Sequence, residues 1–465
     1  MTSPPTNIFL LVVDSLRYDR LSCYGYEEPT SPFLDSLAAD GIKFEQAYST
    51  APWTVPVHGS LFSGQLPSYH GTHRKSTSFK KSADESLAGG LSNGGYQTAG
   101  FSANPWISPE FQFDTGFDYF EFLDGSPPFT DEPTTPSTAI GDLYSTEGLQ
   151  NVLQWCLQGN PVKRFSNGIW KRYFDSGAGV ERVNEAILEW IDSCDRDQKF
   201  VFANYMDVHD PHYDDPFGRS DLQLPPASAR LGVSKSRYQA VYSKRIDFMS
   251  EPNDPERSKR LYDQAIRRVD DGLRNLFEKL ENRIDLSESL VVILGDHGES
   301  LGENGYWGHG TYLYEPLIRI PLLISPSKEN EPLDSDQPTT ILDIIYDIME
   351  KGGVSMDKEY NEPPSVSSEP RPIFAETIGP RPNMEQESLT DGFEAVIYDG
   401  QKLVRNRTTG ETVLTKVDKE SQSEIEQKQL ETFLNRKWDG IDHAIKAEET
   451  ISEEMRSRLS DLGYL

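Results

Sequence analysis

The sequence predicts an α/β protein with a mostly parallel central sheet flanked by helices, followed by a small antiparallel sheet with helices. The first observation is a set of short runs that are apolar at every position, such as Ile8–Val13, which is typical of parallel strands covered on both faces. The second is that helical segments alternate with these runs, as parallel crossover connections require. The third is a late series of short strands with a turn at Asp399-Gly400.

The alternation of strands and helices extends over the first 350 residues. Apolar runs predict strands at Ile8–Val13, Tyr96–Phe101, Phe200–Tyr205, Ser289–Leu294 and Leu317–Ile324. Ile42–Tyr48 is expected to be either a strand or an irregular approach to the segment around Thr54. Helical spacing and end signals predict helices at Ser31–Asp40, about Pro56–Phe62, Glu85–Asn93, Val180–Cys194, Arg260–Leu280 and Thr340–Met349. Pro321 is expected at an edge or at a strand start, because proline has no N–H to give to a central ladder.

Changes in composition predict the domain boundaries. Residues 1–350 are expected to form the main domain, with insertions at about 111–179 and 216–256, where the pattern gives way to polar and Pro-rich sequence. Residues 351–372 are a predicted linker, and residues 373–465 a small C-terminal subdomain. That subdomain is expected to contain strands at Ile373–Glu376, Glu394–Tyr398, Leu403–Asn406 and Thr412–Lys416, and helices near Glu424–Arg436 and Ile441–Leu462.

The charge of the chain argues against two classes of partner. Lys and Arg number 45 against 75 Asp and Glu, which gives a net charge of −30. Such a surface repels nucleic acid and anionic membranes, so neither is expected as a partner. Because the acidity is spread along the chain, we expect a protein from a high-salt organism, where the Debye length falls to about 3 Å at 1 M salt.

The cysteines and the N-terminal segment indicate the compartment. Cys23, Cys156 and Cys194 are widely spaced, so neither a disulfide framework nor a zinc site is predicted. The N-terminal apolar run has no basic region before it and no cleavage pattern after it, and no run reaches the roughly 18 apolar residues of a membrane span. We therefore expect a cytoplasmic protein without a membrane span, and make no prediction of its oligomeric state.

The segment Ala51–Gly64, APWTVPVHGSLFSG, contains a candidate nucleophile. Proline is tolerated in the first turn of a helix, so Pro56 places Thr54 near a helix N-terminus, where N–H groups and positive partial charge favour an anion. A hydroxyl there could attack a phosphorus or sulfur centre if a metal lowered its pKa. Taken alone, the segment also fits a helix-capping Thr54 and a surface His58.

Acidic residues and histidines follow two of the predicted parallel strands. Asp14 follows the first strand, and the pair Asp296-His297 follows Ser289–Leu294. Ligand sites of open α/β sheets lie at the carboxyl ends of strands, and carboxylates and imidazoles bind divalent metals. His309 lies in a Gly-rich loop that is expected to form a wall of the site. As single residues, Asp14 could instead cap a helix, and the histidines could belong to an ordinary polar loop.

A second polar cluster follows the strand Phe200–Tyr205. The sequence MDVHDPHYDD places Asp207, His209, Asp210 and His212 close together. Carboxylates and imidazoles beyond a strand end suit a metal site or general acid-base chemistry. The alternative is a hydrated loop in an acidic protein.

Taken in order, Asp14, the Thr54 segment, the 207–212 cluster and the Asp296-His297 pair resemble the sulfatase family of the alkaline-phosphatase superfamily. The resemblance covers Asn7 to about Ile324, and the later sequence YDGQKLVRN looks like the small second sheet of that family. It implies an alkaline-phosphatase-like fold, with residues 1–350 as the catalytic domain. It also implies a metal-dependent hydrolase of sulfate or phosphate esters.

The sequence departs from the sulfatase pattern at several motif positions. Thr54-Val55-Pro56-Val57-His58 stands where sulfatases have Cys/Ser-x-Pro-Ser-Arg, so Thr54 replaces the residue that becomes formylglycine, and none is expected. Asp14-Ser15 stands in place of paired aspartates, and Trp307-Gly308-His309 in place of Trp-Gly-Lys. A threonine nucleophile looks like nucleotide pyrophosphatases, lipoteichoic acid synthases and phosphoethanolamine transferases of the same superfamily.

The resemblance also implies the ligands of a cation. Asp14, Thr54, Asp296 and His297 would hold one divalent metal ion, with Ca, Mg, Mn and Zn not distinguished. A second metal site would use Asp207, His212 and His309, or these residues together with His209 would contact the anionic group of the substrate.

The predicted reaction begins with attack by Thr54 on the phosphorus or sulfur of a small-molecule or glycan ester. His58, His209 and His309 are expected to stabilise charge on the ester oxygens, and His209 or His309 to protonate the leaving oxygen. A threonine adduct must be released by attack at sulfur or phosphorus, which favours phosphorus. The alternatives are a transferase that moves a phospho-alcohol group to a glycan, and a non-catalytic binding protein of the same fold.

Overall fold

A seven-stranded sheet forms the centre of the protein, in the order β2-β11-β7-β1-β6-β4-β5. The computed structural model describes residues 4–123, 160, 162–163, 179–209, 255–325, 337–354, 371–379, 391–417 and 425–438. The strands of this sheet are β1 (Asn7–Val13), β2 (Ile42–Lys43), β4 (Gln97–Ser102), β5 (Tyr119–Phe122), β6 (Lys199–Tyr205), β7 (Ser289–Gly295) and β11 (Leu322–Ser325).

The pairing confirms the predicted fold class. β1 lies parallel between β6 and β7, and β4 lies parallel between β6 and β5. Of the seven strands, β11 alone runs in the opposite direction, as its antiparallel pairing with both β7 and β2 shows. The carboxyl ends of β1, β4, β6 and β7 therefore meet at one edge of the sheet, where this type of sheet binds its ligands.

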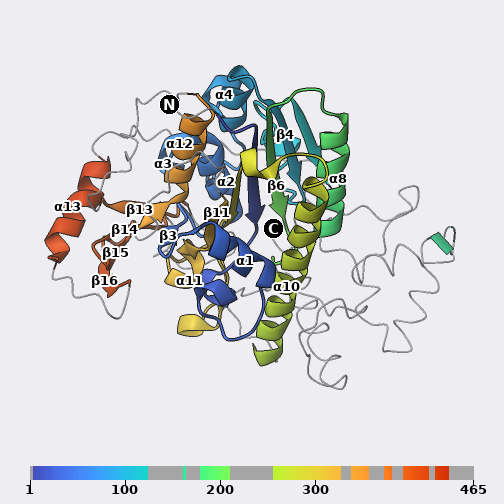
Figure 1. The fold of residues 1–465 in the computed structure, drawn as a ribbon. Helices are drawn as coiled ribbons and strands as arrows, with labels where there is room; N and C mark the ends of the chain where they lie inside the picture. The colour runs from blue at the N-terminus through green and yellow to red at the C-terminus, as the bar shows by residue number, and fades with distance from the viewer. Residues whose placement is uncertain are drawn as a thin grey trace.

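Helices cover both faces of the sheet, as the strands that are buried along their whole length require. Phe9, Leu11 and Val13 face α1 (Pro32–Asp40), α8 (Val180–Ser193) and α10 (Pro255–Leu280). The alternate β1 residues face α2 (Thr54–Ser63), α4 (Leu87–Asn93) and α12 (Ile341–Lys351). Figure 1 shows α8 and α10 on one side of the sheet and α2 and α12 on the other. None of the helices in the described ranges is long and apolar enough to cross a membrane.

The small antiparallel sheet predicted at the C-terminal end is also present. Its strands, in spatial order, are β13 (Ile373–Glu376), β14 (Phe393–Tyr398), β15 (Gln401–Asn406) and β16 (Thr412–Lys416), and α13 (Gln427–Trp438) packs against it. Ile373 and Ile397 share an apolar cluster with Tyr48, Leu317 and Ile318 of the main domain. The sheet is therefore packed onto the large domain (Figure 1). The predicted domain boundaries stay a prediction.

The predicted single strand Leu317–Ile324 is wrong. The segment contains α11 (Glu315–Ile318), β10 (Arg319–Ile320) and then β11, with Pro321 between the two strands. β10 pairs with β3 (Ala47–Tyr48) in a second sheet with β12 (Thr339–Thr340), whereas β11 pairs with β7. The predicted strand Ile42–Tyr48 is divided in the same way, because β2 and β3 belong to different sheets. One short chain segment thus passes from one sheet to the other.

Several elements lie where none is predicted, and β5 and α3 are among them. β5 lies inside the predicted insertion 111–179 and extends the central sheet at its edge, where Phe117 and Phe120 pack against each other. The short helix α3 (Pro67–His70) follows α2. The predicted insertion 216–256, except its last two residues, most of the predicted linker, and the predicted helix Ile441–Leu462 lie outside the described residues.

Asp270 of α10 joins two helices that cover the same face of the sheet. Its carboxylate oxygens accept the N–H groups of Phe33 and Leu34 at the start of α1, each at 2.9 Å. We expect Asp270→Ala to lower the free energy of unfolding by about 1–3 kcal/mol, because one buried and one partly buried N–H group lose their acceptor. Denaturant unfolding measures this loss.

Asp271→Ala is the matched control for this prediction. Asp271 pairs with Arg274 and Arg267 at the helix surface. Its replacement should change the free energy of unfolding by less than about 0.5 kcal/mol. Equal losses in the two variants would contradict the capping role of Asp270.

Candidate active site

The ends of two neighbouring strands bring the predicted acidic residues together. Asp14 follows β1 and Asp296 follows β7, and the parallel register places Val13 beside Gly295. The Ser15 N–H donates to Asp296 Oδ1 at 3.0 Å, with Ser15 held at a φ of 60°, a left-handed conformation that is uncommon for residues other than glycine. Among the described residues, Asp14, Asp296 and His297 form the group whose ligand atoms all lie within 4.8 Å of one another.

Thr54 completes this group. It is the first residue of α2, which begins two residues before the predicted start at Pro56, and it is fully buried. Thr54 Oγ1 lies 3.2 Å from Asp14 Oδ2 and 3.3 Å from His297 Nε2. The hydroxyl therefore lies against two of the residues expected to hold a metal ion.

The buried carboxylates leave a place for positive charge. Asp14 and Asp296 are 0% exposed, and Asp296 Oδ2 has no hydrogen-bond partner although it lies 3.6 Å from His297 Nε2. Burial and the neighbouring Asp14 carboxylate raise the pKa of Asp296 well above its usual value. Burial alone would also raise the pKa of Asp14, but the surrounding histidines lower it. An unpaired buried oxygen beside a second carboxylate, an imidazole and a hydroxyl fits a divalent cation.

His58 lies beneath the first turn of α2 and is not a surface residue. It is fully buried, and its Nδ1 lies 2.9 Å from Thr54 O, so the ring spans the turn that carries the hydroxyl. Its Nε2 lies 3.3 Å from the side-chain amide of Asn204 at the end of β6. Burial lowers the pKa of His58 to about 4, so the ring is uncharged near pH 7.

His309 packs against His297, and His209 packs against His309. The ring centroids of His297 and His309 are 4.6 Å apart, and those of His209 and His309 are 5.1 Å apart. Both rings contribute to lowering the pKa of Asp14, so they lie near the same carboxylate. The structure thus brings together three histidines from the ends of β6, β7 and the following loop.

Asp207 points away from this group. Its Oδ1 lies 4.0 Å from the Arg268 guanidinium on α10, and its Oδ2 is buried without a hydrogen-bond partner. Asp210 and His212 lie outside the described residues. The second metal site therefore stays a prediction, and within the described ranges Asp207 joins no group of three metal-ligating side chains.

Three side chains at the site are missed by the sequence reasoning. The Asn104 amide donates to Asp14 Oδ2 at 2.8 Å, Asn204 faces His58, and Glu299 faces His309 Nδ1 at 3.0 Å. Asn104 and Asn204 follow or end parallel strands, so the rule that selects Asp14 could also have found them. Glu299 has no such signal, because its partner depends on how two loops meet.

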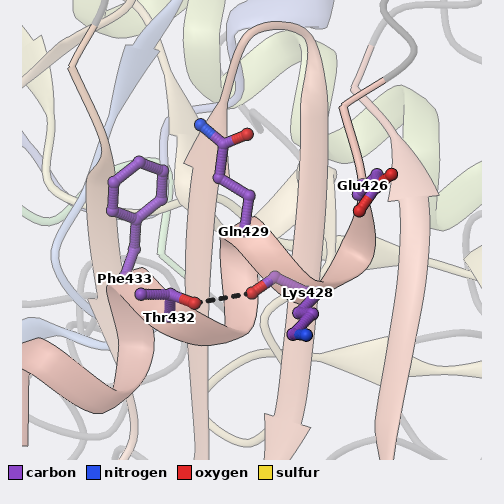
Figure 2. A pocket seen from close by; sticks show the side chains of 5 residues that line it. All are labelled: Glu426, Lys428, Gln429, Thr432 and Phe433. Carbon is purple, nitrogen blue, oxygen red and sulfur yellow. Dashed lines mark hydrogen bonds between the residues drawn. The ribbon is translucent and has the colours of Figure 1, made fainter.

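A shallow pocket lies elsewhere, on α13. Figure 2 shows its lining residues, which are Glu426, Lys428, Gln429, Thr432 and Phe433. The Thr432 hydroxyl donates to Lys428 O at 2.8 Å within the helix, and Phe433 packs against Tyr398 of β14. No residue of the candidate active site lines this pocket.

Comparison with known proteins identifies the family. The sulfatase family model matches residues 6–354. The chain belongs to the sulfatase family. This range contains Asp14, Thr54, Asp296 and His297, so the group assembled in the structure lies wholly within the family's domain.

Sulfatase relatives and solved structures agree with this assignment. Choline-sulfatase from Rhizobium meliloti is 24% identical over 374 residues, which are 77% of this chain and 70% of the relative. The phosphonate monoester hydrolase from Silicibacter pomeroyi matches with a TM-score of 0.61 at 17% identity, covering 94% of each chain. A structure solved with its substrate D-glucosamine-2-N,6-O-disulfate gives a TM-score of 0.60 at 16% identity, covering 94% of this chain and 97% of that chain. At these identities the structures show a shared alkaline-phosphatase-like fold.

The structure of this sulfatase-family protein predicts a pH effect at Asp207. Burial raises the pKa of Asp207 to about 6, although Arg268 opposes the rise. Since the usual value is 3.8, the unfolded chain ionises first, and the folded protein loses stability as the pH rises from about 4 to about 6. The full cost at pH 8 corresponds to about 3 kcal/mol.

Asp207→Asn removes this cost. We expect the variant to be more stable than the wild type at pH 8, and the difference to shrink by about 1.4 kcal/mol at pH 5. Denaturant unfolding at the two pH values measures it, with Asp195→Asn, at an exposed carboxylate, as the control. A variant that is less stable than the wild type at both pH values would contradict this account of Asp207.

Proposed function

We propose that the protein is a divalent-cation-dependent hydrolase of sulfate or phosphate esters with Thr54 as its nucleophile. The observation that carries this proposal is the position of Thr54 Oγ1, 3.2 Å from Asp14 and 3.3 Å from His297, inside a fully buried group of metal-ligating residues. A helix-capping threonine alone would not need two buried carboxylates beside it. Membership of a family of ester hydrolases supports the same activity.

Asp14, Thr54, Asp296 and His297 would hold the cation. The bound cation would lower the pKa of the Thr54 hydroxyl and polarise the ester oxygens. Asn104 would orient Asp14, because its amide already occupies one side of the Asp14 Oδ2 atom. His58, uncharged and bonded to Thr54 O, would hold the turn that carries the nucleophile.

The reaction then proceeds in two displacements. Thr54 Oγ, having lost its proton to solvent when the site is loaded, forms a bond to the phosphorus or sulfur, and the bond to the leaving oxygen breaks. His209 or His309 gives a proton to that oxygen, which departs as an alcohol. Water then attacks the threonine adduct, the bond to Thr54 Oγ breaks, and the same histidine takes the proton from the water.

The side chain of the nucleophile bears on the choice of ester. Thr54 cannot form formylglycine, so its adduct must be released by a second displacement at phosphorus or sulfur. This supports a phosphate or phosphonate ester as the first substrate class to test, with sulfate esters as the second. The sulfatase relatives include a choline-sulfatase, and the solved structures that share the fold include a phosphonate monoester hydrolase. The cytoplasmic location and the high-salt source remain predictions.

Replacement of Thr54 tests the nucleophile. Thr54→Ala should lower kcat by about 10³-fold or more, because it removes the hydroxyl that contacts both Asp14 and His297. The Ser15 hydroxyl donates to the other Asp14 oxygen at 3.1 Å and does not replace this contact. Thr54→Ser keeps a hydroxyl and should stay within about tenfold of the wild type. Turnover of aryl phosphate, phosphonate and sulfate esters with added Mn²⁺, Mg²⁺, Ca²⁺ or Zn²⁺ measures both.

The matched control for Thr54 is Ser63→Ala. Ser63 is a buried hydroxyl on the same helix, and it donates to Gly59 O at 2.6 Å, away from the carboxylates. Its removal should leave kcat unchanged. Full activity of a folded Thr54→Ala protein would contradict the proposal.

Cation binding is tested separately by thermal unfolding. At a cation concentration 100 times its Kd, the wild type should gain about 2.7 kcal/mol of stability. Asp296→Asn should abolish this gain and should raise the unfolding temperature in chelator, because it removes one of two adjacent buried carboxylates.

Asp263→Asn controls for loss of a buried carboxylate. Asp263 accepts from Tyr26 and Arg20, outside the site, so its variant should keep the cation response. A wild-type protein whose unfolding temperature does not respond to any of the four cations would sink the cation-dependent mechanism.

A further inference from the structure

A short antiparallel ribbon follows the Asp296-His297 pair. It consists of β8 (Ser300–Leu301) and β9 (Trp307–Gly308), with Ser300 opposite Gly308 and Leu301 opposite Trp307. Continued by one residue, this register places Glu299 directly opposite His309. Residues opposite each other on an antiparallel pair have neighbouring side chains. The ribbon therefore places the carboxylate of Glu299, two residues after the proposed cation ligand His297, beside the ring of His309.

The Glu299–His309 contact is partly buried and anchored at both ends. Glu299 is 2% exposed, and its Oε2 lies 3.0 Å from His309 Nδ1. The backbone carbonyl of Glu299 accepts from Arg17, and that of His309 accepts from the Tyr306 hydroxyl, each at 2.9 Å. An ionised carboxylate only accepts hydrogen bonds, so His309 Nδ1 donates and Nε2 is the nitrogen on the far side of the ring.

The ring of His309 lies one side chain away from the nucleophile. Its centroid is 4.6 Å from that of His297, whose Nε2 is 3.3 Å from Thr54 Oγ1. The ring centroid of His209 lies 5.1 Å from that of His309. A ring whose Nδ1–H donates to Glu299 is thus held in one orientation beside the reacting centre, and Nε2 is the nitrogen that can give or take a proton there.

We propose that Glu299 is a positioning residue, which holds His309 with Nε2 toward the oxygen that leaves the ester. This inference rests on the proposed hydrolase function and assigns the proton transfer of that function to His309 rather than His209. In the reactive form His309 carries a proton on both ring nitrogens. When the bond from phosphorus or sulfur to the leaving oxygen breaks, its electron pair stays on that oxygen, and the Nε2 proton moves to it. The Nδ1 proton stays on His309, hydrogen-bonded to Glu299, and Nε2 later takes a proton from the attacking water.

The test compares two leaving groups. A 4-nitrophenyl ester leaves readily as its anion, whereas a phenyl ester of the same acid needs a proton on its leaving oxygen. We expect Glu299→Gln to lower kcat for the phenyl ester by about 10- to 100-fold, and kcat for the 4-nitrophenyl ester by less than about threefold, with KM unchanged for both. A purely structural role would lower both kcat values equally.

Glu303→Gln is the matched control. Glu303 lies in the turn between the two strands of the ribbon, and its carboxylate faces Arg17 and Ser300 instead of His309. Its variant should behave as the wild type with both esters. Loss of phenyl ester turnover in Glu303→Gln equal to that in Glu299→Gln would overturn the proposal.

A double variant tests whether Glu299 acts through His309. His309→Asn should show the same dependence on the leaving group, and adding Glu299→Gln to it should cost nothing further. If Glu299→Gln fails to fold, Glu299→Asp keeps the charge and shortens the reach by one methylene, and it should lose turnover with the phenyl ester only. Additive losses, or equal losses with both esters, would overturn the proposal.

These outcomes separate this inference from the proposed function. The wild type with added cation is tested on the phenyl and 4-nitrophenyl esters of phosphate, phosphonate and sulfate. If it hydrolyses none of them, the hydrolase proposal fails and the role of Glu299 fails with it. If the wild type hydrolyses both esters and Thr54→Ala neither, while Glu299→Gln affects both equally, only the positioning role is overturned.

Discussion

The parallel pairing of β1 with β7 places two carboxylates side by side in the interior of the protein. Val13 and Gly295 are register partners, so the residues that follow them, Asp14 and Asp296, leave the sheet together. Both are fully buried, and their mutual repulsion is part of why the pKa of Asp296 is raised. A structure that contains this repulsion is most stable when positive charge lies between the carboxylates, and the rest of the site supplies the means to hold it.

The elements around Asp14 and Asp296 place uncharged side chains and imidazoles against the two carboxylates. α2 brings Thr54 against Asp14, with an uncharged His58 bonded beneath the turn, and β4 is followed by Asn104, whose amide satisfies the Asp14 oxygen that Thr54 also faces. Histidines fill the remaining side, where a carboxylate at Glu299 orients one of them. Asn104 and the uncharged His58 thus fix the positions of Asp14 and of the turn that carries Thr54. His209 and His309 lie where the proposed reaction needs a proton donor or a contact with an anionic oxygen.

Much of this arrangement is predictable from the sequence, because one rule selects it. Asp14 and Asp296-His297 follow runs that read as parallel strands, and such residues converge at one edge of a sheet. The rule fails where contacts depend on register or on short irregular segments. Glu299 meets His309 only because a ribbon of two-residue strands pairs in one register, and Pro316 and Pro321 turn a predicted strand into a helix and two strands. His58 could not be placed, because nothing in the sequence indicates that every residue of α2 is buried.

The central claim is that one cation is held by Asp14, Thr54, Asp296 and His297. The most direct measurement is anomalous diffraction at the manganese edge from crystals of the protein grown with Mn²⁺. The account predicts a single strong peak bounded by these four side chains, with the threonine oxygen at bonding distance of roughly 2.0–2.3 Å. A peak at any other place, or none beside Asp14 and Asp296 in well-diffracting crystals, would contradict it.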